Sequence, residues 1–124
     1  MRLFRRKQEP IPENKKRAVL KALEMMQRPE MAEFITIDNP VDKKGVTPRV
    51  TFTIQSDPVG EVGVNGCQAE DIIEYARNLI IVLNNIFSCS ENKQTIQHLN
   101  GALQWQINRR NDRKYREVEG KAVE

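Results

Sequence analysis

Two long helical segments, predicted one after the other in the C-terminal half, constrain the fold more than any other feature of the sequence. The spacing of apolar residues predicts one helix over 69–86 and another from near Glu91 to about Arg116. The run Ser88-Cys89-Ser90 separates them, and Ser88 and Glu91 have the spacing of a capping box that starts the second helix. Two long helices joined by so short a break predict an antiparallel helical hairpin.

The first predicted helix carries more apolar surface than a single partner helix can cover. Projected at about 100° per residue, its apolar side chains span about half of the circumference, and Ile81 lies outside even that arc. The second helix has one narrower apolar stripe, the natural core of the hairpin, formed by Ile96, Leu99, Leu103 and Ile107. The rest of the first helix must therefore pack against strands or against another copy of the chain.

The N-terminal half predicts a helix and a small sheet. Residues 1–12 read as an arm that ends in prolines, and a helix over about 14–27 follows it. Strands are predicted over 33–37 and, with clear alternation of apolar and polar residues, over 49–55. Three glycines and a proline make 57–66 a loop with sharp local bends.

These elements together predict an α+β fold. We expect a small antiparallel sheet and an N-terminal helix, followed by a long antiparallel C-terminal helical hairpin that mediates oligomerisation. Residues 1–60 form an N-terminal extension containing helix and strands, and residues 61–124 form a helical-hairpin ligand-binding region. We expect the two to make one compact domain, as a length of 124 residues favours.

The formal charge is +3 at pH 7, and it is unevenly distributed. Residues 1–21 carry eight basic and two acidic side chains (+6), residues 22–70 carry four and eight (−4), and residues 71–124 carry eight and seven (+1). A second basic patch, 109–116, lies within the last of these blocks. Such patches indicate a phosphate-rich partner, whether nucleic acid, nucleotide or anionic surface, unless they are simply solvated helix faces.

The second helix places an aromatic residue and several charges on one side. Trp105 projects almost opposite the apolar stripe, and on its side, within an arc of roughly 100°, fall Arg109, Asp112, Arg113 and Arg116. Guanidinium groups so arranged can bind phosphates while an aromatic or guanidinium plane stacks on a base. Alternatively, Trp105 packs against the sheet or a subunit interface, and the arginines reach solvent or pair with Asp112. A small phosphorylated ligand fits this mixed surface better than duplex DNA.

Asn92 is a further candidate for ligand binding, in the first turn of the second helix. Exposed backbone N–H groups and the helix dipole favour anions there, and the asparagine amide offers a donor and an acceptor to a sugar or base. The alternative is an ordinary first-turn residue.

The sequence offers few groups for catalysis or metal binding. It contains no Ser/His/Asp arrangement, phosphate-loop glycine pattern or paired-histidine motif, and a lone helical histidine, His98, is more often structural or solvated. Cys67 and Cys89 belong to no CxxC pair and are expected to be free thiols. We expect no catalytic residue, metal or cofactor. The longest apolar run, 79–83, is too short for a membrane span, and without a secretory signal a cytoplasmic protein is expected.

From Gly60 to Gly120, about half of the chain, the sequence resembles a helical-hairpin family of small phage proteins. The positions that carry the resemblance are Gly63-Val64-Asn65-Gly66, Cys89, Glu91-Asn92, Ile96, Leu99, Ala102-Leu103, Trp105, Arg109, Asp112-Arg113, Arg116 and Val118-Glu119-Gly120. This family includes the Thoeris anti-defence and anti-CBASS sponges. Members with a β-containing extension ahead of the hairpin look like the Thoeris branch, and this chain is similar to them.

The resemblance implies a protein that captures bacterial immune signals without degrading them. The ligands would be glycocyclic ADP-ribose isomers made by TIR enzymes and, in some members, cyclic di- or trinucleotides made by cGAS-like enzymes. Members of the family assemble as homo-oligomers, hexamers among them, and this one would act in the cytoplasm of the infected bacterium. Carried over by position, the ligand contacts would be Asn92, Arg109 and Arg113, followed by Arg116, Asp112 and Trp105.

Two other functions stay open at this point. An enzyme that cleaves the same signals would need a general base or a metal, for which the sequence is a poor source. A small basic nucleic-acid-binding or assembly protein would bind DNA with an affinity that falls steeply with salt. We expect a sponge for a small cyclic nucleotide, with no membrane partner, rather than either of these.

Overall fold

The computed structural model describes residues 13–38, 41–42, 45–46 and 48–116, and it confirms the predicted α+β class. In chain order its elements are α1 (Glu13–Met26), η1 (Pro29–Met31), β1 (Ile35–Asp38), β2 (Val41–Asp42), β3 (Gly45–Val46), β4 (Arg49–Phe52), α2 (Val59–Val62), α3 (Ala69–Ile86) and α4 (Ser90–Tyr115). The two long helices and the N-terminal helix begin and end within two residues of their predicted bounds. The predicted arm over residues 1–12 lies outside the described residues.

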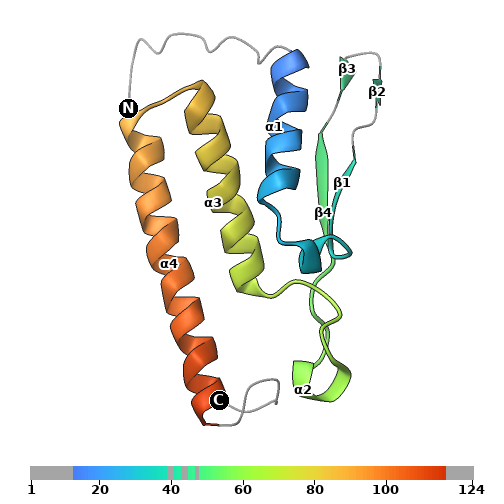
Figure 1. The fold of residues 1–124 in the computed structure, drawn as a ribbon, viewed down its shortest axis with the longest axis vertical. Coiled ribbons are helices and arrows are strands. Elements are labelled where there is room, and N and C mark those ends of the chain that lie inside the picture. Colours follow the sequence, from blue (N-terminus) through green and yellow to red (C-terminus); the bar gives the residue numbers. More distant parts are fainter. Residues whose placement is uncertain (1–12, 39–40, 43–44, 47, 117–124) are drawn as a thin grey trace.

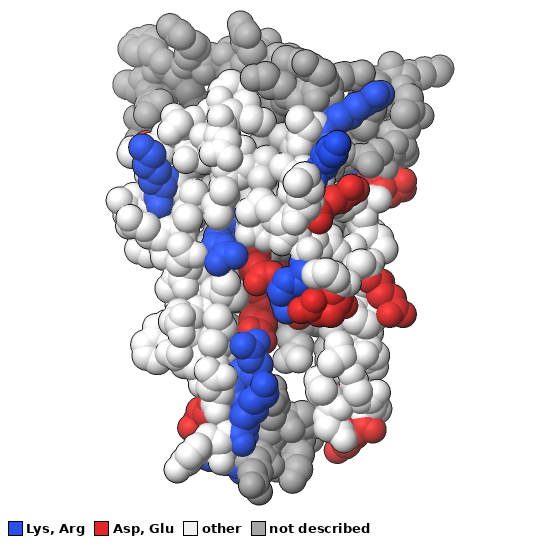
Figure 2. Space-filling model, in the orientation of Figure 1, with Lys and Arg blue, Asp and Glu red and all other residues white. Residues whose placement is uncertain are grey.

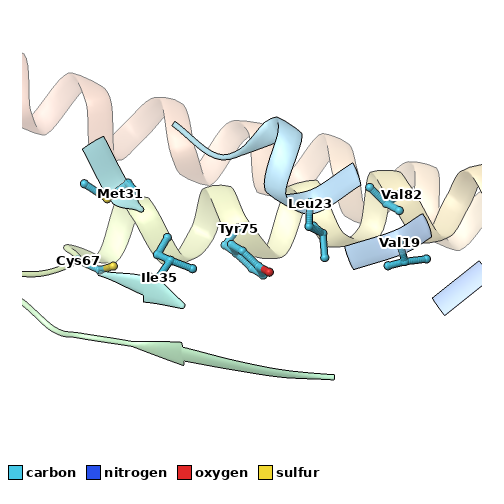
Figure 3. Close-up of a cluster of buried hydrophobic side chains, with 7 residues drawn as sticks. All are labelled: Val19, Leu23, Met31, Ile35, Cys67, Tyr75 and Val82. Carbon is cyan, nitrogen blue, oxygen red and sulfur yellow. The ribbon is translucent and has the colours of Figure 1, made fainter. Parts of the chain in front are cut away.

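Helix α3 is the centre of the molecule. It runs beside α4 as an antiparallel hairpin, and α1 and the β1–β4 pair lie on its other side (Figure 1). The largest group of buried side chains joins these elements (Figure 3), and its members are Val19, Leu23, Met31, Ile35, Cys67, Tyr75 and Val82. The side of α3 that carries Tyr75 and Val82 is thus buried within one chain, whereas Ile73, Ile80, Ile81 and Leu83 stay partly exposed.

The sheet is a short antiparallel pair. β1 and β4 align with Ile35 opposite Phe52 and Ile37 opposite Val50, and β2 and β3 form a separate two-residue pair. The predicted second strand is longer than the observed one, because pairing with β1 ends at Phe52. Beyond it the chain turns toward the start of α3, and Ile54 forms an isolated parallel bridge with Cys67.

The loop before α3 is held by two amide side chains. Gln55 Nε2 donates to the carbonyl oxygens of Asp57 (3.1 Å) and Gly63 (2.9 Å), and its Oε1 accepts from the Asn65 backbone N–H at 2.9 Å. The Asn65 side chain in turn bonds Ser56. The sequence predicted only a loop over 57–66. The structure corrects this by placing the short helix α2 inside it.

The N-terminal caps of the two long helices are Gln68 at α3 and Cys89 at α4, and the second differs from the cap predicted there. At α3 the Gln68 N–H donates to Asp71 Oδ2 at 2.8 Å, and the Asp71 N–H donates to the Gln68 carbonyl oxygen at 3.0 Å. The capping box predicted between Ser88 and Glu91 is wrong. Helix α4 starts at Ser90, so its N-cap is Cys89, whose Sγ accepts from the Asn92 N–H at 3.4 Å.

Tyr75 gives a testable property of this core. Its ring packs edge-on against Phe52, with centroids 5.4 Å apart, but its buried hydroxyl has no hydrogen-bond partner in the described part of the chain. Burial and the nearby Glu24 carboxylate both raise the pKa of this hydroxyl. Because an unsatisfied buried hydroxyl costs about 1–3 kcal/mol, Tyr75→Phe is expected to raise the free energy of unfolding by about 1 kcal/mol.

Chemical denaturation of Tyr75→Phe checks this expectation. Tyr115→Phe is the matched control, because Tyr115 is 88% exposed and loss of its hydroxyl should change nothing. A loss of 1 kcal/mol in Tyr75→Phe alone would show that the hydroxyl is satisfied in solution.

Candidate ligand-binding face on the last helix

The outer side of α4 presents an exposed aromatic ring among charges. Trp105 is 73% exposed, so it does not pack against the sheet of its own chain. Arg109, Asp112 and Arg116 are also exposed, within three turns of Trp105. Arg116 Nε donates to Asp112 Oδ2 at 3.0 Å, so one arginine pairs with Asp112, as the alternative interpretation of this surface held. We call these four residues the outer face of α4.

Arg113 does not belong to that exposed surface. Only 7% of it is exposed, although the projection placed it on the same side as Trp105. It lies about 80° around the helix from Trp105, at the edge of the predicted arc and toward the hairpin. The structure therefore corrects the prediction of a single exposed stripe, because Arg113 faces inward while Arg109 faces solvent.

Asn92 is half-buried in the first turn of α4, as predicted. Its Nδ2 donates to the Phe87 carbonyl at 3.3 Å, and its backbone N–H is used by the Cys89 cap. Within the described residues, its carbonyl oxygen Oδ1 accepts no hydrogen bond. The side chain is thus held in place through the Nδ2 end of its amide alone.

One chain does not bring Asn92 and Arg109 together. They are 17 residues apart on a continuous helix, which at 1.5 Å per residue is about 26 Å along the axis. The predicted contacts therefore fall into two groups along α4, Asn92 at its start and the outer face with the buried Arg113 in its second half.

Two arginines that the sequence analysis did not single out bind the acidic side of α3. Arg28 Nε donates to Glu74 at 2.9 Å, and its Nη2 contacts Asp71, while Arg110 Nη1 bonds both carboxylate oxygens of Glu70 at 2.6 and 2.7 Å. Figure 2 shows acidic atoms along the middle of this side with basic atoms beside them. In the sequence, the three acidic residues within 70–74 are the pattern that could have predicted these ion pairs.

The Arg28 pairs fix the N-terminal part of the chain to α3, and the Arg110–Glu70 pair joins the two helices of the hairpin. Burial alone would lower the pKa of Arg28, but its hydrogen bonds to Glu74 and Asp71 outweigh that effect and raise the pKa above its ordinary value. Arg28 is therefore a permanent cation. Its role and that of Arg110 are structural, since their guanidinium groups are already bound to carboxylates.

A hollow of about 490 Å³ lies away from α4, between the end of α1 and β1. None of the predicted ligand contacts lines it. Its walls include Glu24, Gln27, Arg28 and the strand residues 35–37.

The described residues contain no group of three or more His, Cys, Asp or Glu side chains placed to hold a metal ion. Cys67 is buried and Cys89 exposed, and both are free thiols, as predicted. His98 is exposed on α4. Within the described ranges, no helix has the length and apolar character that crossing a bilayer takes.

Comparison with known proteins supports the resemblance seen in the sequence. No protein-family model matches the chain. The chain is 39% identical over 71 residues to Thoeris anti-defense 1 of Bacillus phage SBSphiJ7, a match that covers 56% of this chain and 50% of that protein. The chain thus spans about half the length of this curated relative. The predicted resemblance to Thoeris anti-defence proteins is confirmed.

Proposed function

From this similarity to a Thoeris anti-defence protein, we propose that the chain is a phage anti-defence sponge, which binds glycocyclic ADP-ribose and leaves it intact. The ligand contacts are Asn92, Arg109 and Arg113, with Arg116, Asp112 and Trp105 beside them. The protein acts in the cytoplasm of the infected bacterium and is not an enzyme. Cyclic di- or trinucleotides are a second ligand class for the same protein.

The observation that carries the proposal is the exposed outer face of α4. Trp105 and Arg109 stand in solvent within four residues of each other, an arrangement that suits a base and a phosphate of one ligand. Trp105 is 73% exposed, so its indole face is open to a partner. A nucleotide covers it by stacking, at about 1–3 kcal/mol.

The separation of Asn92 from Arg109 makes the site intermolecular. A cyclised ADP-ribose is too compact to span about 26 Å of helix, so Asn92 and Arg109 on one ligand must come from two copies. Two α4 helices that run in opposite directions bring the start of one beside the end of the other. This arrangement agrees with the predicted oligomerisation through the hairpin, in a hexamer or a smaller assembly.

The inventory of groups favours capture over cleavage. Charge-assisted hydrogen bonds contribute about 1.5–3 kcal/mol each. Two of them and one stacked base contribute about 4–9 kcal/mol together, so tight binding takes a preorganised pocket and further contacts from a second copy. His98 is exposed, and the outer face holds one carboxylate, Asp112, already bound to Arg116. No described residue there is placed as a general base.

Recovery of the bound ligand tests the proposal. The full chain is incubated with glycocyclic ADP-ribose, separated from free ligand by gel filtration and heat-denatured, and the released material is chromatographed. Intact ligand in stoichiometric amount is expected. Fragments would show an enzyme, and absence of bound ligand, with salt-sensitive binding of DNA in its place, would show a nucleic-acid-binding protein.

A further inference from the structure

The strand β1 has an open edge on the side away from β4. The Phe34 carbonyl accepts from the Thr53 N–H at 2.8 Å, so in this antiparallel pair the Phe34 carbonyl and the backbone groups of Thr36 are directed at β4. Ile35 and Ile37 must then direct theirs outward. The Ile35 carbonyl confirms this, because it accepts from the Gln27 side-chain amide at 3.2 Å instead of from a strand.

The open edge borders a hollow. The 490 Å³ hollow between α1 and β1 is lined by 35–37 together with Glu24, Gln27 and Arg28. Within the described part of the chain, β1 pairs with β4 alone. The outward N–H and C=O of Ile37 therefore face a space that is large enough for a ligand. At the Ile35 carbonyl, the Gln27 side-chain amide already donates the hydrogen bond that the backbone N–H of an added strand would donate.

The hollow is acidic in character. Among the described residues that line it, Arg28 alone is basic, and its charge is matched by Glu30, Asp71 and Glu74. Glu24 pairs with no basic side chain that the structure describes. A ligand that enters the hollow therefore meets a carboxylate that no described basic side chain pairs with, next to an open strand edge.

We propose that this hollow is a docking site for an extended peptide segment with a lysine or arginine side chain, which adds to β1 as a strand. The peptide backbone pairs with the N–H and C=O of Ile37, and its basic side chain lies against Glu24. Main-chain bonds to an exposed sheet edge are a common mode of peptide recognition. The site shares no residue with the outer face of α4, so the result of its test does not depend on whether the protein is a sponge.

The test uses the full chain and fluorescein-labelled hexapeptides of alternating valine and lysine. In fluorescence polarisation, the valine–lysine peptide binds, whereas the valine–glutamate peptide and a backbone N-methylated valine–lysine peptide do not. Glu24→Lys is expected to weaken binding at least about fivefold. Glu61→Lys, which makes the same charge change on the exposed helix α2, leaves it unchanged.

Amide hydrogen exchange by NMR locates the peptide. Binding is expected to slow exchange at Ile37 and leave Thr36, which is directed at β4, unchanged. Equal affinity for the acidic peptide, equal affinity in Glu24→Lys, or peptide binding without protection of Ile37 would each overturn the proposal.

Discussion

Arg109→Ala is expected to weaken the binding of glycocyclic ADP-ribose by about 10- to 100-fold. The guanidinium is exposed on the outer face of α4, where its charge-assisted bonds to a phosphate would contribute about 1.5–3 kcal/mol. Because the side chain is exposed in the isolated chain, its loss should leave the melting temperature unchanged. Isothermal titration calorimetry gives the affinity, and differential scanning calorimetry gives the stability.

Lys114→Ala is the matched control for this experiment. Lys114 is exposed and about 180° around α4 from Trp105, so the variant removes one positive charge from the opposite side of the same turns. It should change affinity by less than about twofold. Arg113→Ala differs from both, since its side chain is buried, and it should lower the melting temperature as well as the affinity. Equal affinity losses in Arg109→Ala and Lys114→Ala would mean that only net charge matters.

Gly66→Ala is expected to destabilise the protein by about 3 kcal/mol, lowering the melting temperature by about 10 °C. A Cβ at Gly66 would lie 2.5 Å from the Gln55 backbone nitrogen and 2.7 Å from the Ile54 carbonyl oxygen. Both are backbone atoms, so no side-chain rotation relieves the clash. The chain must move at the Ile54–Cys67 bridge, where Gln55 N–H bonds the Cys67 carbonyl at 2.8 Å.

Gly101→Ala is the control for the same change elsewhere in the chain. A Cβ at Gly101 meets nothing within 4 Å, and the residue lies inside α4. Alanine is favoured over glycine there by about 1 kcal/mol, so this variant should be more stable than the parent chain. Thermal unfolding followed by circular dichroism compares the two. A Gly66→Ala chain as stable as the parent would show that the bridge is not part of the folded state in solution.

The helices could be predicted because their signals are local. The apolar spacing in 69–86 and the break at Ser88-Cys89-Ser90 fix the hairpin from neighbouring residues alone. Strand pairing and capping depend on contacts between distant residues or on the exact first residue of a helix. The length of β4, the short helix α2 and the Cys89 cap were therefore not predicted from the sequence. The division at residue 60 stays a prediction.

The ligand contacts could be predicted only as residues on one helix. Projection gives the angle of Arg113 around α4, but not how far the packed hairpin covers it. Likewise, the ion pairs of Arg28 with Asp71 and Glu74 join residues more than 40 positions apart, which no local pattern reports. The use of Asn92, Arg109 and Arg113 as ligand contacts remains a prediction.

Native mass spectrometry of the full chain mixed with glycocyclic ADP-ribose tests most directly whether assembled copies hold the signal intact. We predict an assembly of 14.4 kDa chains that retains ligand of unaltered mass. In Arg109→Ala the same assembly should form with little ligand bound. Single chains without ligand, or an assembly that carries only ligand fragments, would contradict the account.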